Sequence, residues 1–131
     1  MLPVTSITAA ALALLLVTLA AVTVQRRMRH GAAFGDAGQQ ALTSAIRAHS
    51  NLAEYAPTGL ILLGLLEVAG ATHFALALSA AMFVVARVLN AIGLFNPPGP
   101  PTFSRSAGIV VTLLVLTGWA TWLLVIVAAP L

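Results

Sequence analysis

The sequence predicts an all-α membrane protein, a bundle of four transmembrane helices forming one domain over residues 1–131. Three observations predict this fold. The chain is 60% hydrophobic and only 7% charged, whereas a soluble domain carries about 25% charged residues. It contains four long apolar segments, and about 20 apolar residues cross a hydrocarbon core of about 30 Å. Its few charges gather near one side of these segments. A water-facing surface cannot be made from so few charged residues, so lipid must cover much of it.

The first apolar segment, residues 4–24, has no charged side chain before Arg26. A cleavable signal peptide would carry its positive charge ahead of a shorter apolar run. Here Arg26, Arg27 and Arg29 follow the run instead. We therefore interpret the segment as a retained span that leads into a glycine-rich loop at residues 31–40.

The next segments are predicted from apolar runs and helix-breaking residues. Residues 41–69 are polar in their first half, apolar in their second, and contain Pro57. A membrane helix tolerates an internal proline because neighbouring groups satisfy the freed backbone groups. After a short turn, the third span is expected at residues 74–95. Residues 96–101 hold four prolines and one glycine, which end a helix, and the fourth span follows at 105–128.

The positions of the arginines predict the orientation. Positive residues flank the cytoplasmic ends of spans. The arginine cluster after the first span, Arg47 and Arg105 all border the first or third connection, and the second connection has none. We expect a multi-pass protein, in the inner or plasma membrane if bacterial, with both termini outside and the first and third loops cytoplasmic. The basic residues therefore indicate topology and not nucleic-acid binding.

The composition also limits the chemistry. The chain contains no cysteine, which excludes disulfides, thiolate metal sites and a protein thiol nucleophile. Three scattered histidines do not indicate a metal site. Thiol chemistry, if there is any, must come with a ligand.

Four of the nine charged side chains fall within the second and third spans: Arg47, Glu54, Glu67 and Arg87. A charged residue at mid-membrane costs about 2.5–3.5 kcal/mol on insertion scales, so it normally faces the bundle interior or a wet cavity. On the second span, polar residues recur at helical spacing and share one face: Arg47, Asn51, Glu54 and Thr58. We expect this face to be an inward polar stripe.

The depth of these residues follows from antiparallel packing of the second and third spans. At about 1.5 Å per residue, Arg87 and Asn90 fall within about one turn of Glu54. A Glu54–Arg87 ion pair would neutralise both charges, although such a pair can simply fix helix register. More donors gather at the same end: Arg47, Ser50, Asn51, Arg105 and Ser106. Together they favour a basic cavity for an anionic ligand.

The run Arg47–Pro57, R-A-H-S-N-L-A-E-Y-A-P, resembles the main signature of the MAPEG family, the membrane-associated proteins in eicosanoid and glutathione metabolism. The likeness is strongest to its small bacterial members. Three further pieces agree in order and spacing, so the resemblance covers nearly the whole chain: G-D-A-G at 35–38, R-V-L-N-A-I-G at 87–93, and Arg105-Ser106.

The resemblance implies a homotrimer of four-helix subunits, with glutathione bound between neighbours near the cytoplasmic side. Members include glutathione transferases and peroxidases as well as leukotriene and prostaglandin synthases, which act on lipophilic substrates. By position, five residues are implied to bind or support glutathione: Arg47, Asn51, Glu54, Arg87 and Asn90. Arg105 and Ser106 resemble the catalytic pair near the glutathione sulfur in the prostaglandin-synthase branch.

The chain departs from the family pattern at four positions. Ser50 stands where the prostaglandin-synthase branch has arginine, and Asn90 where it has histidine. Leu94 and Ile109 stand where glutathione-active branches have tyrosine. The loss of these side chains weakens both ligand binding and thiol activation. The resemblance therefore supports the fold more strongly than it supports glutathione chemistry.

Three functions compete. The first is a glutathione-dependent transferase or peroxidase acting on lipophilic electrophiles, and we favour it. The second is a non-catalytic membrane scaffold or ligand-binding protein that keeps the family fold. The third is a small four-helix drug exporter; such exporters carry an essential acid in their first helix, and this first span has none.

Overall fold

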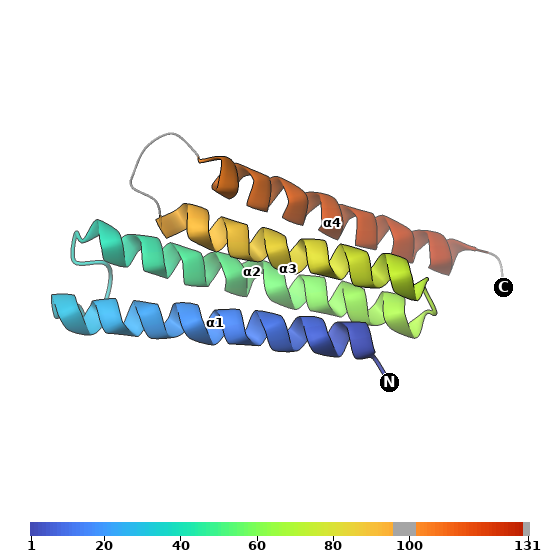
Figure 1. Ribbon diagram of the computed structural model, residues 1–131, viewed down its shortest axis with the longest axis horizontal. Coiled ribbons are helices and arrows are strands. Elements are labelled where there is room, and N and C mark those ends of the chain that lie inside the picture. Colours follow the sequence, from blue (N-terminus) through green and yellow to red (C-terminus); the bar gives the residue numbers. More distant parts are fainter. Residues whose placement is uncertain (96–101, 130–131) are drawn as a thin grey trace.

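The protein is a bundle of four antiparallel helices, seen side by side in Figure 1. The computed structural model describes residues 1–95 and 102–129. The start of α1, the end of α4 and the α2–α3 turn lie at one end, called here the terminal end, and the α1–α2 loop lies at the other, the loop end. The helices are α1 (Pro3–His30), α2 (Gln40–Val68), α3 (His73–Phe95) and α4 (Phe103–Ala128). The predicted four-helix membrane bundle is confirmed, while the predicted proline stop at 96–101 lies outside the described residues.

Three of the four described helices, α1, α3 and α4, are long and apolar enough to cross a membrane. Helix α2 has the length, at 29 residues, but the polar residues of its first half lower its mean hydropathy. It packs against each of the other three helices, and this contact holds it among the apolar spans. Large apolar side chains such as Leu14, Ile61, Val85 and Leu114 are exposed on the bundle surface, as expected where lipid is the solvent.

Helix α1 continues well past the predicted end of its apolar run. Arg26, Arg27 and Arg29, which the sequence analysis placed after the first span, lie in the last two turns of α1. The helix ends at Gly31, whose left-handed backbone (φ 61°) lets its N–H bond back to the last turn. Positive side chains are favourable there because the helix dipole is negative at its C-terminus. The Arg27 guanidinium also donates to three loop carbonyls, those of Ala32, Ala33 and Gly35.

Asp36 ties the α1–α2 loop to the start of α2. One carboxylate oxygen accepts the Thr43 hydroxyl at 2.7 Å, and the other accepts the backbone N–H of Gly38 at 3.0 Å. These bonds, the Thr43 hydroxyl first, hold the pKa of Asp36 below its usual value. The segment G-D-A-G thus forms a hydrogen-bonded turn, in which Gly35, Ala37 and Gly38 have left-handed backbone angles.

Glu67, near the C-terminal end of α2, caps the N-terminus of α1 at the terminal end. Its two carboxylate oxygens accept the backbone N–H groups of Val4 at 2.9 Å and Thr5 at 2.8 Å, and the Thr5 hydroxyl at 2.7 Å. The first N–H groups of a helix have no partner within it, and a negative charge there also complements the helix dipole. Glu67 therefore serves the fold and lies far from the polar residues of the first half of α2.

The core between α2, α3 and α4 is built on two aromatic side chains. Phe83 and Trp119 are both buried, with ring centroids 5.3 Å apart. The indole N–H of Trp119 donates to the Ser79 hydroxyl at 2.9 Å. Gly59 leaves room for the Phe83 ring, which lies only 2.5 Å from where a β-carbon on residue 59 would be. This packing sets the spacing of the three helices that carry the polar residues.

Candidate functional site

A polar cavity of about 580 Å³ opens between α2, α3 and α4 in the loop-end half of the bundle. Five of the seven residues singled out from the sequence line it, namely Arg47, Asn51, Glu54, Asn90 and Arg105. Its other lining residues are Ile46, Ser50, Leu94 and Ile109. Three helices therefore bring the predicted donors together in one place. The four positions that depart from the family pattern also belong to this wall.

The cavity is electrostatically positive. Two guanidinium groups, of Arg47 and Arg105, face one carboxylate, of Glu54, so the lining carries a net charge of +1. Each of these three side chains is exposed in the single chain. Asn51 is half-buried and Asn90 is buried, so both amides are held in the wall. Such a wall suits a ligand that carries more negative than positive charge.

Arg87 does not line the cavity but lies behind its wall, with 2% of its surface exposed. Its guanidinium donates to Asn51 Oδ1 at 2.9 Å, to the Gly108 carbonyl at 3.3 Å and to the Thr112 hydroxyl. The ring of Tyr55 lies 5.0 Å from the guanidinium carbon. These contacts confirm the depth estimated from the sequence, because Arg87 meets α2 within one turn of Glu54.

The expected Glu54–Arg87 ion pair is wrong. In the described part of the chain Arg87 pairs with no carboxylate, and Glu54 is turned to the cavity and is exposed. The reason is rotation about the helix axis: Asn51 and Tyr55, four residues apart, share the face of α2 that meets α3. Glu54 lies on the flank of that face, at the same depth but in a different direction.

Two glycines, Gly93 and Gly108, bring α4 and with it Arg105 against α3, and neither was assigned a role from the sequence. A β-carbon on Gly93 would lie 2.6 Å from the Arg105 backbone nitrogen. One on Gly108 would lie 2.7 Å from the backbone nitrogen of Asn90 and 2.8 Å from the carbonyl of Ala86. Helices α3 and α4 therefore touch backbone to backbone beside the cavity. Small residues that allow such close approach are a known feature of membrane helix contacts.

The predicted catalytic pair separates in the structure. The Arg105 side chain reaches the cavity, and its carbonyl accepts a bond from the Asn90 amide at 3.4 Å. Ser106 is half-buried in the first turn of α4 and is not among the lining residues. Tyr55 and Thr112, which contact Arg87, were not predicted. Each lies four residues after another residue that contacts Arg87, Tyr55 after Asn51 and Thr112 after Gly108. This one-turn spacing is the signal that would have identified them.

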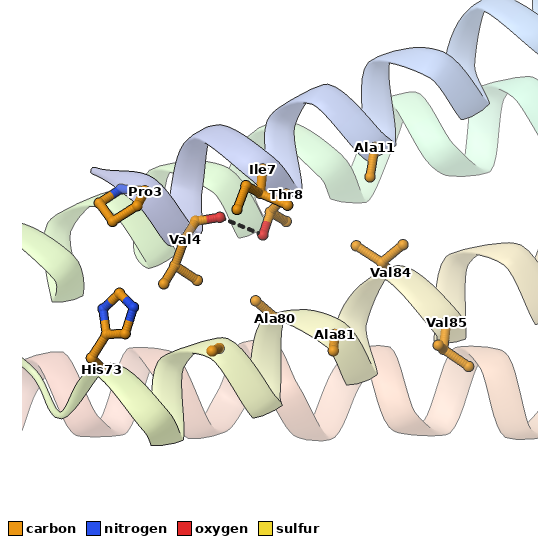
Figure 2. A pocket seen from close by; sticks show the side chains of 11 residues that line it. Pro3, Val4, Ile7, Thr8, Ala11, His73, Ala80, Ala81, Val84 and Val85 are labelled. Carbon is orange, nitrogen blue, oxygen red and sulfur yellow. Dashed lines mark hydrogen bonds between the residues drawn. The ribbon is translucent and has the colours of Figure 1, made fainter. Parts of the chain in front are cut away.

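A second hollow, of about 400 Å³, lies between α1 and α3 at the terminal end, far from the polar cavity. Figure 2 shows its wall of small and aliphatic side chains, with the His73 imidazole near one end. The Thr8 hydroxyl in this wall is already bonded to the Val4 carbonyl at 2.8 Å. Its lining has no carboxylate or guanidinium. The hollow therefore lacks the charged groups that make the polar cavity the candidate site.

The fold and the cavity define a class: small membrane proteins of four helices with a basic cavity between the helices. Residues 5–125 match the profile of the MAPEG family. The chain belongs to the MAPEG family, as its signature run suggested.

The chain is similar to the inner membrane protein YecN of Escherichia coli, in strain K12 and in strain O6:H1. The identity is 33% over 81 residues, and the match spans 62% of this chain and 62% of the relative. No solved structure matches the chain.

Proposed function

We propose that the basic cavity binds glutathione, and that the protein is a transferase or peroxidase using glutathione against lipophilic electrophiles. The observation that carries the proposal is the cavity wall: two guanidinium groups, one carboxylate and two side-chain amides around about 580 Å³ of space. Family membership supports it, because the family is named for eicosanoid and glutathione metabolism.

The donor set fits glutathione, which has two carboxylates, one ammonium group and one thiol. Arg47 and Arg105 suit the carboxylates or a thiolate, and Glu54 suits the ammonium group. The volume lies within the range of about 300–1,000 Å³ found for small-ligand sites. When bound, glutathione supplies a sulfur nucleophile. It can form a carbon–sulfur bond that displaces a leaving group or, with a second glutathione, reduce a hydroperoxide to alcohol and water while the two thiols are oxidised to glutathione disulfide.

The role proposed for Arg105 is to stabilise the thiolate, since a guanidinium beside a sulfur favours its charged form. Ser106 is a weaker candidate for the same task because it is not among the lining residues. Arg47, Glu54 and the two amides are proposed to orient the ligand. The exposed apolar surface of the bundle would let an electrophile reach the site from the lipid.

The alternative is a ligand-binding protein without catalysis, and one observation favours it. Ser50, Leu94 and Ile109 line the cavity at the positions where the sequence lacks the arginine and the phenols of active branches. Thiol activation then depends on Arg105, with Ser106 as the weaker candidate. Binding without thiolate formation would distinguish this alternative from the enzyme.

We also propose that the protein assembles as a homotrimer. Arg47, Glu54 and Arg105 are exposed in the single chain, yet Glu54 lies at the middle of α2. A charge open to lipid at that depth costs about 2.5–3.5 kcal/mol, and a neighbouring subunit over the cavity would remove this cost. Native mass spectrometry from detergent should therefore give a mass of three chains, and a monomer would contradict the proposal.

For orientation, we propose that both termini lie outside and the loop end lies in the cytoplasm of a bacterial cell. The native chain has no cysteine, so single cysteines can report on each end. Ala33→Cys in the first loop should resist an impermeant maleimide in intact cells, while Thr72→Cys in the α2–α3 turn should react. Both positions are exposed. The reverse labelling pattern would overturn this orientation.

The proposed function is tested by glutathione binding to purified protein in detergent. At a concentration of 100 times Kd, glutathione should stabilise the fold by about 2.7 kcal/mol and should show thiolate absorbance in the ultraviolet. S-methylglutathione is the matched control, because it should stabilise the fold without that absorbance. If saturating glutathione leaves the unfolding temperature unchanged, the proposal fails. Assays with a chlorinated aromatic acceptor and a lipid hydroperoxide then separate transferase from peroxidase.

A further inference from the structure

Asn51 joins the buried arginine to the cavity. Its side-chain oxygen accepts a bond from Arg87 at 2.9 Å, and the residue lines the cavity. A guanidinium has donors and no acceptor, so the amide must turn its oxygen toward Arg87. Among the described residues the only buried side-chain polar atom without a partner is Arg87 Nε. No described residue accepts a bond from the Asn51 NH₂ group, so its absence from the buried unpaired atoms means that it keeps exposed surface, and the cavity is the space that Asn51 lines.

Arg87 is itself held from three sides. Its second terminal nitrogen donates to the Gly108 carbonyl and to the Thr112 hydroxyl, both on α4. Tyr55 on α2 covers the guanidinium at 5.0 Å. These contacts leave Arg87 little freedom to turn. Because Arg87 pairs with no described carboxylate, its charge also polarises the amide that it contacts.

We propose that Arg87 is a positioning residue: through its bond to the Asn51 oxygen, it presents both N–H donors of Asn51 to the cavity, so that this part of the wall takes an anionic oxygen of the ligand. This inference rests on the proposed function and deepens it. It assigns a carboxylate of glutathione, and not its ammonium group, to Asn51. Arg87 acts without touching the ligand.

Asn51→Asp is the most discriminating substitution. It keeps the side-chain shape and lets a carboxylate pair with Arg87, so the fold should be at least as stable as the native one. It removes both N–H donors and adds a negative charge, so glutathione Kd should rise by about 10-fold or more. Equal glutathione affinity in Asn51→Asp and the native protein would overturn the proposal.

A double-mutant cycle separates positioning from general support of the fold. Arg87→Met should raise glutathione Kd by about 10-fold in the native background and by less than about twofold in Asn51→Ala, where no amide remains to be oriented. Equal losses in both backgrounds would mean that Arg87 has a structural role only. Arg87→Lys retains the charge but not the planar fork, and it provides the cycle if the methionine variant does not fold.

A measurement without ligand keeps this inference separate from the proposed function. The chain has three asparagines, so ¹⁵N-labelled asparagine gives few side-chain amide signals. Arg87→Lys should shift the Asn51 amide signals while those of Asn90 move little. If the native protein does not bind glutathione, the proposed function fails but these shifts still decide the orientation of Asn51. Unchanged Asn51 signals would refute the positioning role.

Discussion

Replacing Arg105 with alanine is expected to raise the Kd of glutathione by about 10- to 100-fold and to abolish thiolate absorbance. The range corresponds to the loss of one charge-assisted bond of about 1.5–3 kcal/mol, at 1.4 kcal/mol for each factor of ten. Arg105 lines the cavity on α4, opposite the polar face of α2. In a wall without phenols, it is the donor proposed for the sulfur. Isothermal titration and ultraviolet difference spectra in detergent measure the two effects.

Arg29→Ala is the matched control for this prediction. Arg29 is an exposed arginine in the last turn of α1, and it does not line the cavity. Its loss changes the net charge of the chain by the same amount, but it should leave glutathione binding within about twofold, since exposed charges at a distance are screened. If both variants weaken binding equally, the arginines act only through the overall charge, and Arg105 has no specific role.

Gly108→Val is expected to destabilise the protein by about 3 kcal/mol, at the upper end of the range for overpacking. A β-carbon at this position would lie within 2.8 Å of the α3 backbone, and backbone atoms cannot move aside as a flexible side chain can. Helix α4 would have to separate from α3, taking with it the Gly108 carbonyl that holds Arg87. Unfolding by sodium dodecyl sulfate, followed by circular dichroism, measures the loss.

Gly118→Ala provides the comparison on the same helix. No heavy atom outside α4's own backbone lies within 4 Å of a β-carbon placed there, and alanine is the better helix former by about 1 kcal/mol. This variant should be as stable as the native protein or slightly more so. A Gly108→Val variant as stable as Gly118→Ala would show that α3 and α4 are not in the close contact described.

Much of the cavity was predictable because helical spacing is a local property. Arg47, Asn51 and Glu54 share a face of any helix that contains them. Their depth relative to Arg87 followed from the rise per residue and from an antiparallel connection. The end of α1 was less predictable: hydropathy marks where the apolar run stops, whereas backbone hydrogen bonds continue to the left-handed Gly31.

The partner of Arg87 was not predictable, because depth along a helix does not determine rotation about its axis. Rotation follows from how side chains pack between helices, and here Gly93 and Gly108 bring α4 close enough for Thr112 and the Gly108 carbonyl to bind Arg87. That packing turns Asn51 to Arg87 and leaves Glu54 in the cavity.

The sequence by itself determined four membrane helices, one polar stripe and a family, since each depends on composition or on periodicity along a single helix. Only the tertiary structure decided which polar groups satisfy one another and which stay open to a ligand. The physical reason is that a buried charge takes whichever donors and acceptors the neighbouring helices bring within hydrogen-bond distance, and that distance is set by contacts between segments far apart in the chain.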